Sequence, residues 1–189
     1  MRKVLIDWPL TPYTGWGNYG IQLAQALMEQ GCYQPVLMAP NDRTSHCDLH
    51  WLAALDYLES GSESICRSLQ EATHKGTLPL PTSSFIAFSP LGNVVPPPRC
   101  QAQHHVGVTF FECSDFSKQQ LETLQAFDLV VTGSRWNQSL LQQLGVSKSQ
   151  LVHQGVDTGL FNPAQVPKLI NRSLVIFSGG KLETRKGQD

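Results

Sequence analysis

Residues 1–39 carry the pattern that most restricts the fold of this chain. The largely apolar segment 4–8 predicts a short buried strand. The glycines and prolines that follow predict a loop, because a helix or strand would not tolerate them. A helix is expected from about Asn18 to Gln30, because apolar side chains recur there at helical spacing and Gly31 can end it. A second apolar run at 35–39 predicts another strand. This order forms the βαβ unit of a parallel, doubly wound sheet.

The rest of the chain continues this alternation. Further strands are expected at 85–88, 106–111, 128–132, 151–153 and 174–177, and further helices at 52–58, 65–72, 117–126 and 134–144. Ser117 with Gln120 has the pattern of a capping box, and Ser134 can cap the helix that Gly145 ends. The buried stripe of that helix is expected to contain Trp136, Leu140, Leu141 and Leu144. We therefore expect an α/β protein with a doubly wound, mostly parallel, Rossmann-like sheet.

Composition argues against several classes of protein. The 189 residues carry a net charge of −1 and no long run of cations, so no nucleic-acid partner is expected. The five cysteines are odd in number and scattered, which favours reduced thiols over disulfides or a zinc site. No apolar run reaches the length of a membrane span, although peripheral contact with a membrane stays open. The expected location is the cytoplasm.

The sequence also suggests where domains begin and end. Residues 1–162 are expected to form a Rossmann-like domain, 163–172 a linker, and 173–189 the first strand and loop of a second domain that stops at Asp189. The strand at 174–177 would then lack its own sheet. Because unpaired backbone is costly to bury, we expect it to pair with the edge of the first sheet or with a second copy of the chain, giving a homodimer.

The last residues have the features of an anion-binding loop. Gly179 and Gly180 allow a tight turn after the strand at 174–177, and the cations Lys181, Arg185 and Lys186 follow. Backbone amides freed by glycine and positive side chains can converge on phosphate. We therefore expect an anionic ligand at this loop.

The loop before the first helix is a second place where phosphate could bind. Gly15, Gly17 and Gly20 have the spacing of the dinucleotide motif G-x-G-x-x-G, although the loop as a whole is longer than in that motif. Phosphate could lie at the amino end of the helix that follows. An equally plausible interpretation is that the glycines shape a tight turn between strand and helix.

Taken together, these segments resemble the amino-terminal half of group 1 glycosyltransferases with the GT-B architecture. The glycines of the first loop stand where that family has them. Three further matches are Thr132-Gly133-Ser134 with the helix ending Leu144-Gly145-Val146, then Gly155-Val156-Asp157 with Phe161 and Pro163, and Gly180-Lys181-Leu182 with Lys186-Gly187. They span nearly the whole chain, and the last two in tandem are fairly specific.

The resemblance implies that a sugar is transferred from a nucleotide-sugar donor to an unknown acceptor, with retention and without a metal or other cofactor. Lys181 and Lys186 would bind the donor diphosphate, with Arg185 sharing this role and Gly15 and Gly17 contributing backbone amides. In this family most donor contacts lie in the carboxy-terminal domain, which we expect beyond Asp189. The chain alone is therefore not expected to transfer sugar.

Glu112 is the candidate catalytic residue. Many family members have a histidine after the corresponding strand, and this sequence resembles a subgroup that reads T-x-x-E there. The carboxyl end of a strand is where open α/β sheets place ligands. Glu112 could orient an acceptor hydroxyl or balance developing positive charge. The alternative is a structural carboxylate that pairs with a neighbouring helix end.

Two other functions stay open at this point. One is a non-enzymatic module of the same fold that binds a glycan or a protein. The other is a dinucleotide-binding oxidoreductase domain, suggested by the spacing of Gly15, Gly17 and Gly20. That second alternative is weakened because no clear acidic residue follows the second strand; Asn41 and Asp42 are the nearest candidates.

Overall fold

The computed structural model describes residues 1–38, 49–75, 81–156, 158–159, 162 and 179. The chain divides into two compact units, Met1–Gln154 and Gly155–Asp189. In the second unit, the Asn162 side-chain amide donates a hydrogen bond of 2.8 Å to the Gly159 carbonyl, which closes a short turn. The domain limits expected after residues 162 and 172 stay predictions, and the expected strand at 174–177 and its pairing lie outside the described residues.

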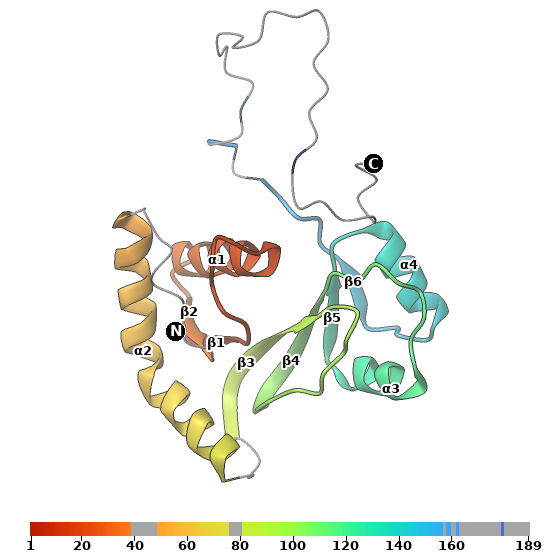
Figure 1. Cartoon of the computed structure of the whole chain (residues 1–189), viewed down its shortest axis with the longest axis horizontal. Helices are drawn as coiled ribbons and strands as arrows, with labels where there is room; N and C mark the ends of the chain where they lie inside the picture. The colour runs from red at the N-terminus through yellow and green to blue at the C-terminus, as the bar shows by residue number, and fades with distance from the viewer. Residues whose placement is uncertain (39–48, 76–80, 157, 160–161, 163–178, 180–189) are drawn as a thin grey trace, which may run out of the picture. The chain divides into compact units, whose positions relative to one another are not determined.

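The first unit is built on one parallel sheet, whose strands have the order β2-β1-β3-β4-β5-β6 (Figure 1). The strands are β1 (Arg2–Ile6), β2 (Tyr33–Leu37), β3 (Pro81–Leu91), β4 (Gln101–Thr109), β5 (Leu129–Thr132) and β6 (Ser149–Leu151). The helices are α1 (Gly15–Glu29), α2 (Leu49–His74), α3 (Lys118–Ala126) and α4 (Arg135–Gln143). Each pair of neighbouring strands is parallel. The predicted α/β, doubly wound, Rossmann-like fold is confirmed, with parallel pairing throughout the described sheet.

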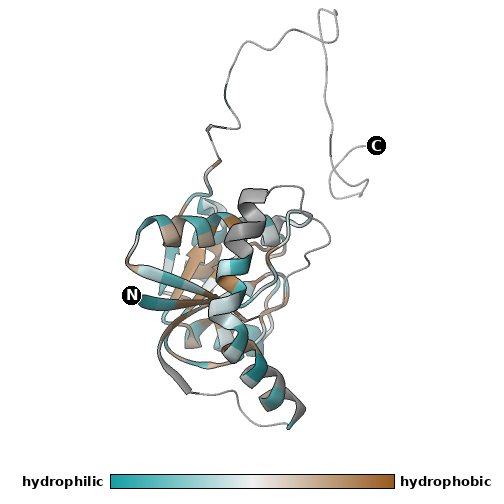
Figure 2. Cartoon of the chain, turned by 90° about the vertical axis from the view of Figure 1, so that its left-hand side faces the viewer, coloured by the Kyte–Doolittle hydropathy of each residue, from teal (hydrophilic) through white to brown (hydrophobic). Residues whose placement is uncertain are grey.

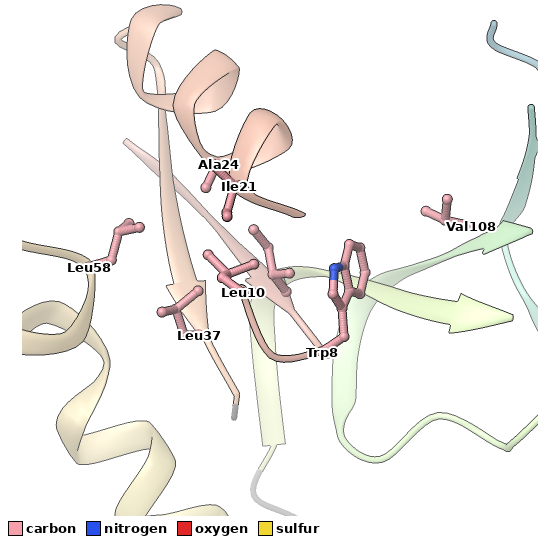
Figure 3. Packing of buried hydrophobic residues seen from close by; sticks show 8 residues of the cluster. Trp8, Leu10, Ile21, Ala24, Leu37, Leu58 and Val108 are labelled. Atoms are coloured by element: carbon pink, nitrogen blue, oxygen red, sulfur yellow. The ribbon is translucent and has the colours of Figure 1, made fainter. Parts of the chain in front are cut away.

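The two faces of the sheet bury different helices. Ile6, Leu37 and Val108 are on the face that packs against α1, where Ile21 and Ala24 point from the helix toward Leu10 (Figure 3). The other face packs against α3 and α4 through a second cluster: Leu91, Val95, Phe111, Leu124, Phe127, Val130, Leu141 and Val146. In Figure 2, brown, apolar segments of the strands are seen in the interior behind the partly teal helix α2. Burial on both faces explains why the strands read as continuous apolar runs.

Helix α1 begins earlier than the sequence suggested. We expected Gly15, Gly17 and Gly20 to lie in a loop, and this is wrong, because all three belong to the helix. Thr14 caps it by accepting the Gly17 N–H at 3.0 Å, which supplies a start signal that outweighs the low helix propensity of glycine. The end is as predicted, since Gly31 follows the helix with φ of 67°.

Helix α2 is a single helix, whereas we expected two separate helices at 52–58 and 65–72. It runs through Gly61 and covers the outer edge of β2. Ser62 Oγ accepts the Leu37 N–H at 2.8 Å, and Cys66 Sγ donates to the Leu37 carbonyl at 2.9 Å. Side chains of α2 thus satisfy backbone groups that an edge strand would otherwise leave unpaired.

The second half of the unit agrees closely with the sequence. Ser117 and Gln120 form the predicted capping box, Ser134 caps α4, and Gly145 follows α4 with φ of 84°. One prediction fails here: Trp136 is not in the buried stripe but is 53% exposed. Asn137 takes the inward position and is 6% exposed.

Candidate functional site

The strand order reverses between β1 and β3, and this marks a candidate site. From β1 the chain crosses to β2 at one side, and β3 then returns to the opposite side of β1. Open α/β sheets bind ligands at the carboxyl ends of the strands beside such a reversal. The segments that leave β1, β3, β4 and β5 all start from this edge of the sheet. We call it the carboxyl edge.

An ion pair between a buried carboxylate and a half-exposed guanidinium joins the first two of these segments. Asp7, directly after β1, binds Arg99 on the connection from β3 to β4. Arg99 Nε donates to Asp7 Oδ2 at 3.0 Å, and Nη2 donates to Oδ1. Burial raises the pKa of the Asp7 carboxyl, and the hydrogen bond and positive charge of Arg99 oppose that rise. The pair fixes a guanidinium group, 57% exposed as a side chain, beside the reversal of strand order.

The glycines of α1 are used in packing. A Cβ on Gly17 would lie 2.2 Å from the Thr11 carbonyl oxygen, and one on Gly20 would lie 2.4 Å from Trp8 Nε1. The Trp8 indole in turn donates to the Trp16 carbonyl at 2.9 Å. These contacts favour the interpretation in which glycine permits a tight turn. The Gly17 amide is already bonded to the Thr14 cap, while nothing lies within 4 Å of a Cβ on Gly15.

Glu112 lies at the carboxyl edge, three residues after the end of β4, and is exposed. Its backbone N–H donates to Asn93 Oδ1 at 3.0 Å. The Asn93 carbonyl accepts a hydrogen bond of 3.1 Å from Gln120 Nε2 at the start of α3. Asn93 therefore connects the segment after β3 to the end of β4 and to α3, and it holds the backbone of Glu112 in place.

An aromatic contact brings the start of α1, with Gly15, near the end of β4, which Glu112 follows. Trp16, next to Gly15, packs against Phe110, two residues before Glu112, with ring centroids 4.6 Å apart. The start of α1 and the end of β4 are thus neighbours. The predicted phosphate-binding residues Lys181, Arg185 and Lys186 lie outside the described residues, so their convergence with this edge stays a prediction.

The start of α4 completes the edge. Ser134 Oγ accepts the Asn137 N–H at 3.1 Å, and Asn137 Nδ2 donates to the buried Phe111 carbonyl at 3.1 Å. This anchors α4 to the segment that carries Glu112. Family models and curated proteins were compared with the sequence, and neither comparison gave a match.

Several of these residues were not identified from the sequence. Asp7 could have been found by its position, because it is a carboxylate near the end of the first predicted strand, at the edge where ligands bind. Arg99 is 92 residues away, and no local pattern indicates the pairing. In the described ranges, no group of three or more His, Cys, Asp or Glu side chains could hold a metal ion. Nor does any helix there combine the length and apolarity that crossing a bilayer requires.

Proposed function

We propose that the first unit is the acceptor-side domain of a retaining glycosyltransferase that uses a nucleotide-sugar donor. The observation that carries the proposal is the gathering of segments at the carboxyl edge. Asn93 bonds the segment after β3 to Glu112, and Trp16 on α1 packs against Phe110. Glu112, whose backbone is bonded to Asn93, follows a strand at the edge where open parallel sheets commonly bind ligands, and this supports a role for its carboxylate. The resemblance at 155–163 and 180–187 supports the same function.

The chemistry assigns separate tasks to Glu112 and to the cations at 181–186. In the transfer, the bond between the anomeric carbon and the diphosphate oxygen breaks, and its electron pair leaves with the diphosphate. A new bond forms from the acceptor oxygen to the same carbon, and the proton of the acceptor hydroxyl passes to the departing diphosphate. Lys181 and Lys186 would stabilise the departing charge, with Arg185 beside them. Glu112 would orient the acceptor hydroxyl.

A dinucleotide-binding oxidoreductase domain receives less support. Its motif needs glycines that let the backbone approach a pyrophosphate. Here Gly17 and Gly20 face Thr11 and Trp8 at distances that leave no room for a Cβ, and the Gly17 N–H is bonded to Thr14. The glycines thus have a packing role that requires no nucleotide.

The test is calorimetric titration of the purified chain with UDP, GDP, ADP and dTDP, and with NAD. We expect one of the nucleoside diphosphates to bind, and Lys181→Ala to weaken it by about tenfold or more, as for loss of a charged hydrogen bond. Lys75→Ala is the matched control, because this exposed lysine is at the end of α2. Binding of NAD alone, or equal affinity in the Lys181 variant, would overturn the proposal.

A further inference from the structure

Trp136 and Asn137 occupy positions opposite to those that hydrophobicity favours. Asn137 is 6% exposed, while the neighbouring indole is 53% exposed, in the first turn of α4. Exposing an indole forgoes the free energy of burying a large apolar surface, and burying an amide requires a hydrogen-bond partner. Where such local rules are broken in a folded protein, a functional role is a common reason. The position is also at the carboxyl edge, beside the segment that carries Glu112.

The indole of Trp136 is held by its surroundings. Its ring lies against Phe111, with centroids 5.8 Å apart and an interplanar angle of 51°. Phe111 packs edge-on against Phe116 at 5.0 Å, and its carbonyl binds Asn137 Nδ2. The indole therefore makes a tilted contact with a buried aromatic ring, while about half of the residue's surface stays open to solvent. This is a rigid apolar platform of the kind that lowers the entropic cost of binding.

Two exposed charged residues are neighbours of this platform in the sequence. Glu112 directly follows Phe111, is exposed, and has its backbone fixed by Asn93. Arg135 precedes Trp136 on α4 and is also exposed. A ligand seated on the indole would therefore meet an apolar surface, and a carboxylate and a guanidinium from the neighbouring residues could accept and donate hydrogen bonds.

We propose that Trp136 stacks against a pyranose ring of the acceptor, so that the acceptor is a saccharide or a glycoside. The C–H groups on one face of a pyranose are apolar and slightly positive, and they suit the negative face of an indole. The ring hydroxyls then point toward Glu112 and Arg135, which can accept and donate hydrogen bonds. This inference rests on the proposed transferase function and adds the chemical class of its acceptor.

A membrane surface fits these residues less well than a sugar. Membrane-binding faces combine aromatic side chains with an excess of lysine and arginine, which are attracted to anionic lipids. The exposed charged residues at 112–118 and at 135 are Glu112, Asp115, Lys118 and Arg135, two of each sign. A neutral, hydroxylated ligand matches this balance.

The experiment is saturation-transfer-difference NMR on the purified chain with methyl α-D-glucopyranoside, methyl α-D-mannopyranoside and methyl β-D-galactopyranoside. We expect at least one glycoside to receive saturation mainly on the C–H groups of one ring face. Trp136→Ala should weaken its affinity by about two- to tenfold, and Trp136→Phe should retain part of it. Tyr57→Ala is the matched control, since this aromatic residue of α2 is 55% exposed and should not affect binding.

The remaining outcomes also decide the proposal. Absence of saturation transfer with every glycoside, or equal affinity in Trp136→Ala, overturns it. Binding to phosphatidylcholine vesicles containing phosphatidylglycerol that is lost in Trp136→Ala also overturns it, in favour of a membrane contact. If a glycoside binds through Trp136 but no nucleoside diphosphate binds, the transferase function falls and a saccharide-binding site stands. If a nucleoside diphosphate binds but no glycoside binds through Trp136, only the stacking role of Trp136 is rejected.

Discussion

At the scale of single residues, Asp7 and Arg99 set the electrostatics of the carboxyl edge. The Asp7 side chain is 5% exposed, and its burial raises the pKa because the charged form loses hydration. Arg99 opposes this effect, and its own pKa is raised by the hydrogen bond to Asp7. A buried carboxylate that is paired with a cation is sensitive to loss of that partner, far more than a surface pair is.

Replacing Arg99 with methionine should destabilise the protein in a pH-dependent way. We expect the free energy of unfolding to fall by about 2–3 kcal/mol at neutral pH. This is at or below the low end of the usual cost of breaking a buried ion pair, because the Arg99 side chain is half exposed. Without Arg99, the pKa of folded Asp7 rises further above its unfolded value near 3.8. Stability linked to a raised pKa is full below the unfolded pKa and is lost as pH rises through the folded pKa. The penalty should therefore shrink on acidification, as measured by urea unfolding at several pH values.

Arg67→Met provides the control for this experiment. Arg67 forms an exposed pair with Glu63 on α2, so its loss should cost less than about 1 kcal/mol at any pH. The double variant Asp7→Asn, Arg99→Met should be less destabilised than the sum of the single changes, because it leaves no buried charge. An Arg99→Met penalty that stays constant with pH would contradict this account.

At the scale of elements, the start of α1 depends on contacts that the loop before it makes with the helix. The loop folds back so that Thr11 touches Gly17, and Leu10 and Trp8 touch Gly20. Leu10 and Trp8 are then buried with Ile21 and Ala24 under the helix. The glycines are thus required because the loop lies directly on the helix surface.

Alanine at two of these glycines should have opposite consequences. Gly17→Ala would place a Cβ 2.2 Å from a backbone oxygen, which cannot move without shifting the loop, so we expect a cost of about 1–3 kcal/mol. Gly15→Ala meets nothing within 4 Å and should be neutral or stabilise by up to about 0.5–1 kcal/mol through helix propensity. Thermal and urea unfolding of both variants provide the measurement. Equal destabilisation by the two changes would disprove the packing role.

The same elements indicate what could be predicted from the sequence. The ends of α3 and α4 were predicted correctly because capping and a left-handed glycine are local signals, as at Ser117, Ser134 and Gly145. The start of α1 was missed because the contacts of Gly17 and Gly20 depend on how the loop folds back. Trp136 was misplaced because the anchoring of Asn137 to Phe111 joins residues 26 apart. Local patterns thus predicted the elements, while tertiary contacts decided the site.

At the scale of the whole first unit, the order of strands determines which distant segments meet. Alternating strands and helices indicated a parallel sheet, but the position of β3 beside β1 brings Arg99 to Asp7 and Asn93 to Glu112. In the middle of β4, the same sheet holds the partly buried His105. Its Nε2 accepts the Ala102 N–H at 3.3 Å, and Nδ1 is buried without a hydrogen-bond partner in the described part of the chain.

His105 should make the stability of the protein fall on mild acidification. Burial lowers its pKa below 6.5, and the nearby Asp128 carboxylate, which also lies 4.0 Å from His104, only partly offsets this. A lowered folded pKa means that the stabilising contribution is complete above the unfolded pKa of 6.5 and is lost as pH falls through the folded pKa. Wild-type urea unfolding between about pH 8 and pH 5 should therefore show declining stability, with a slope from this residue of at most about 1.4 kcal/mol per pH unit.

His105→Gln should flatten this decline, whereas His104→Gln, at an exposed position beside the same carboxylate, should leave it largely unchanged. An identical decline in the His105 variant would show that another group controls acid stability.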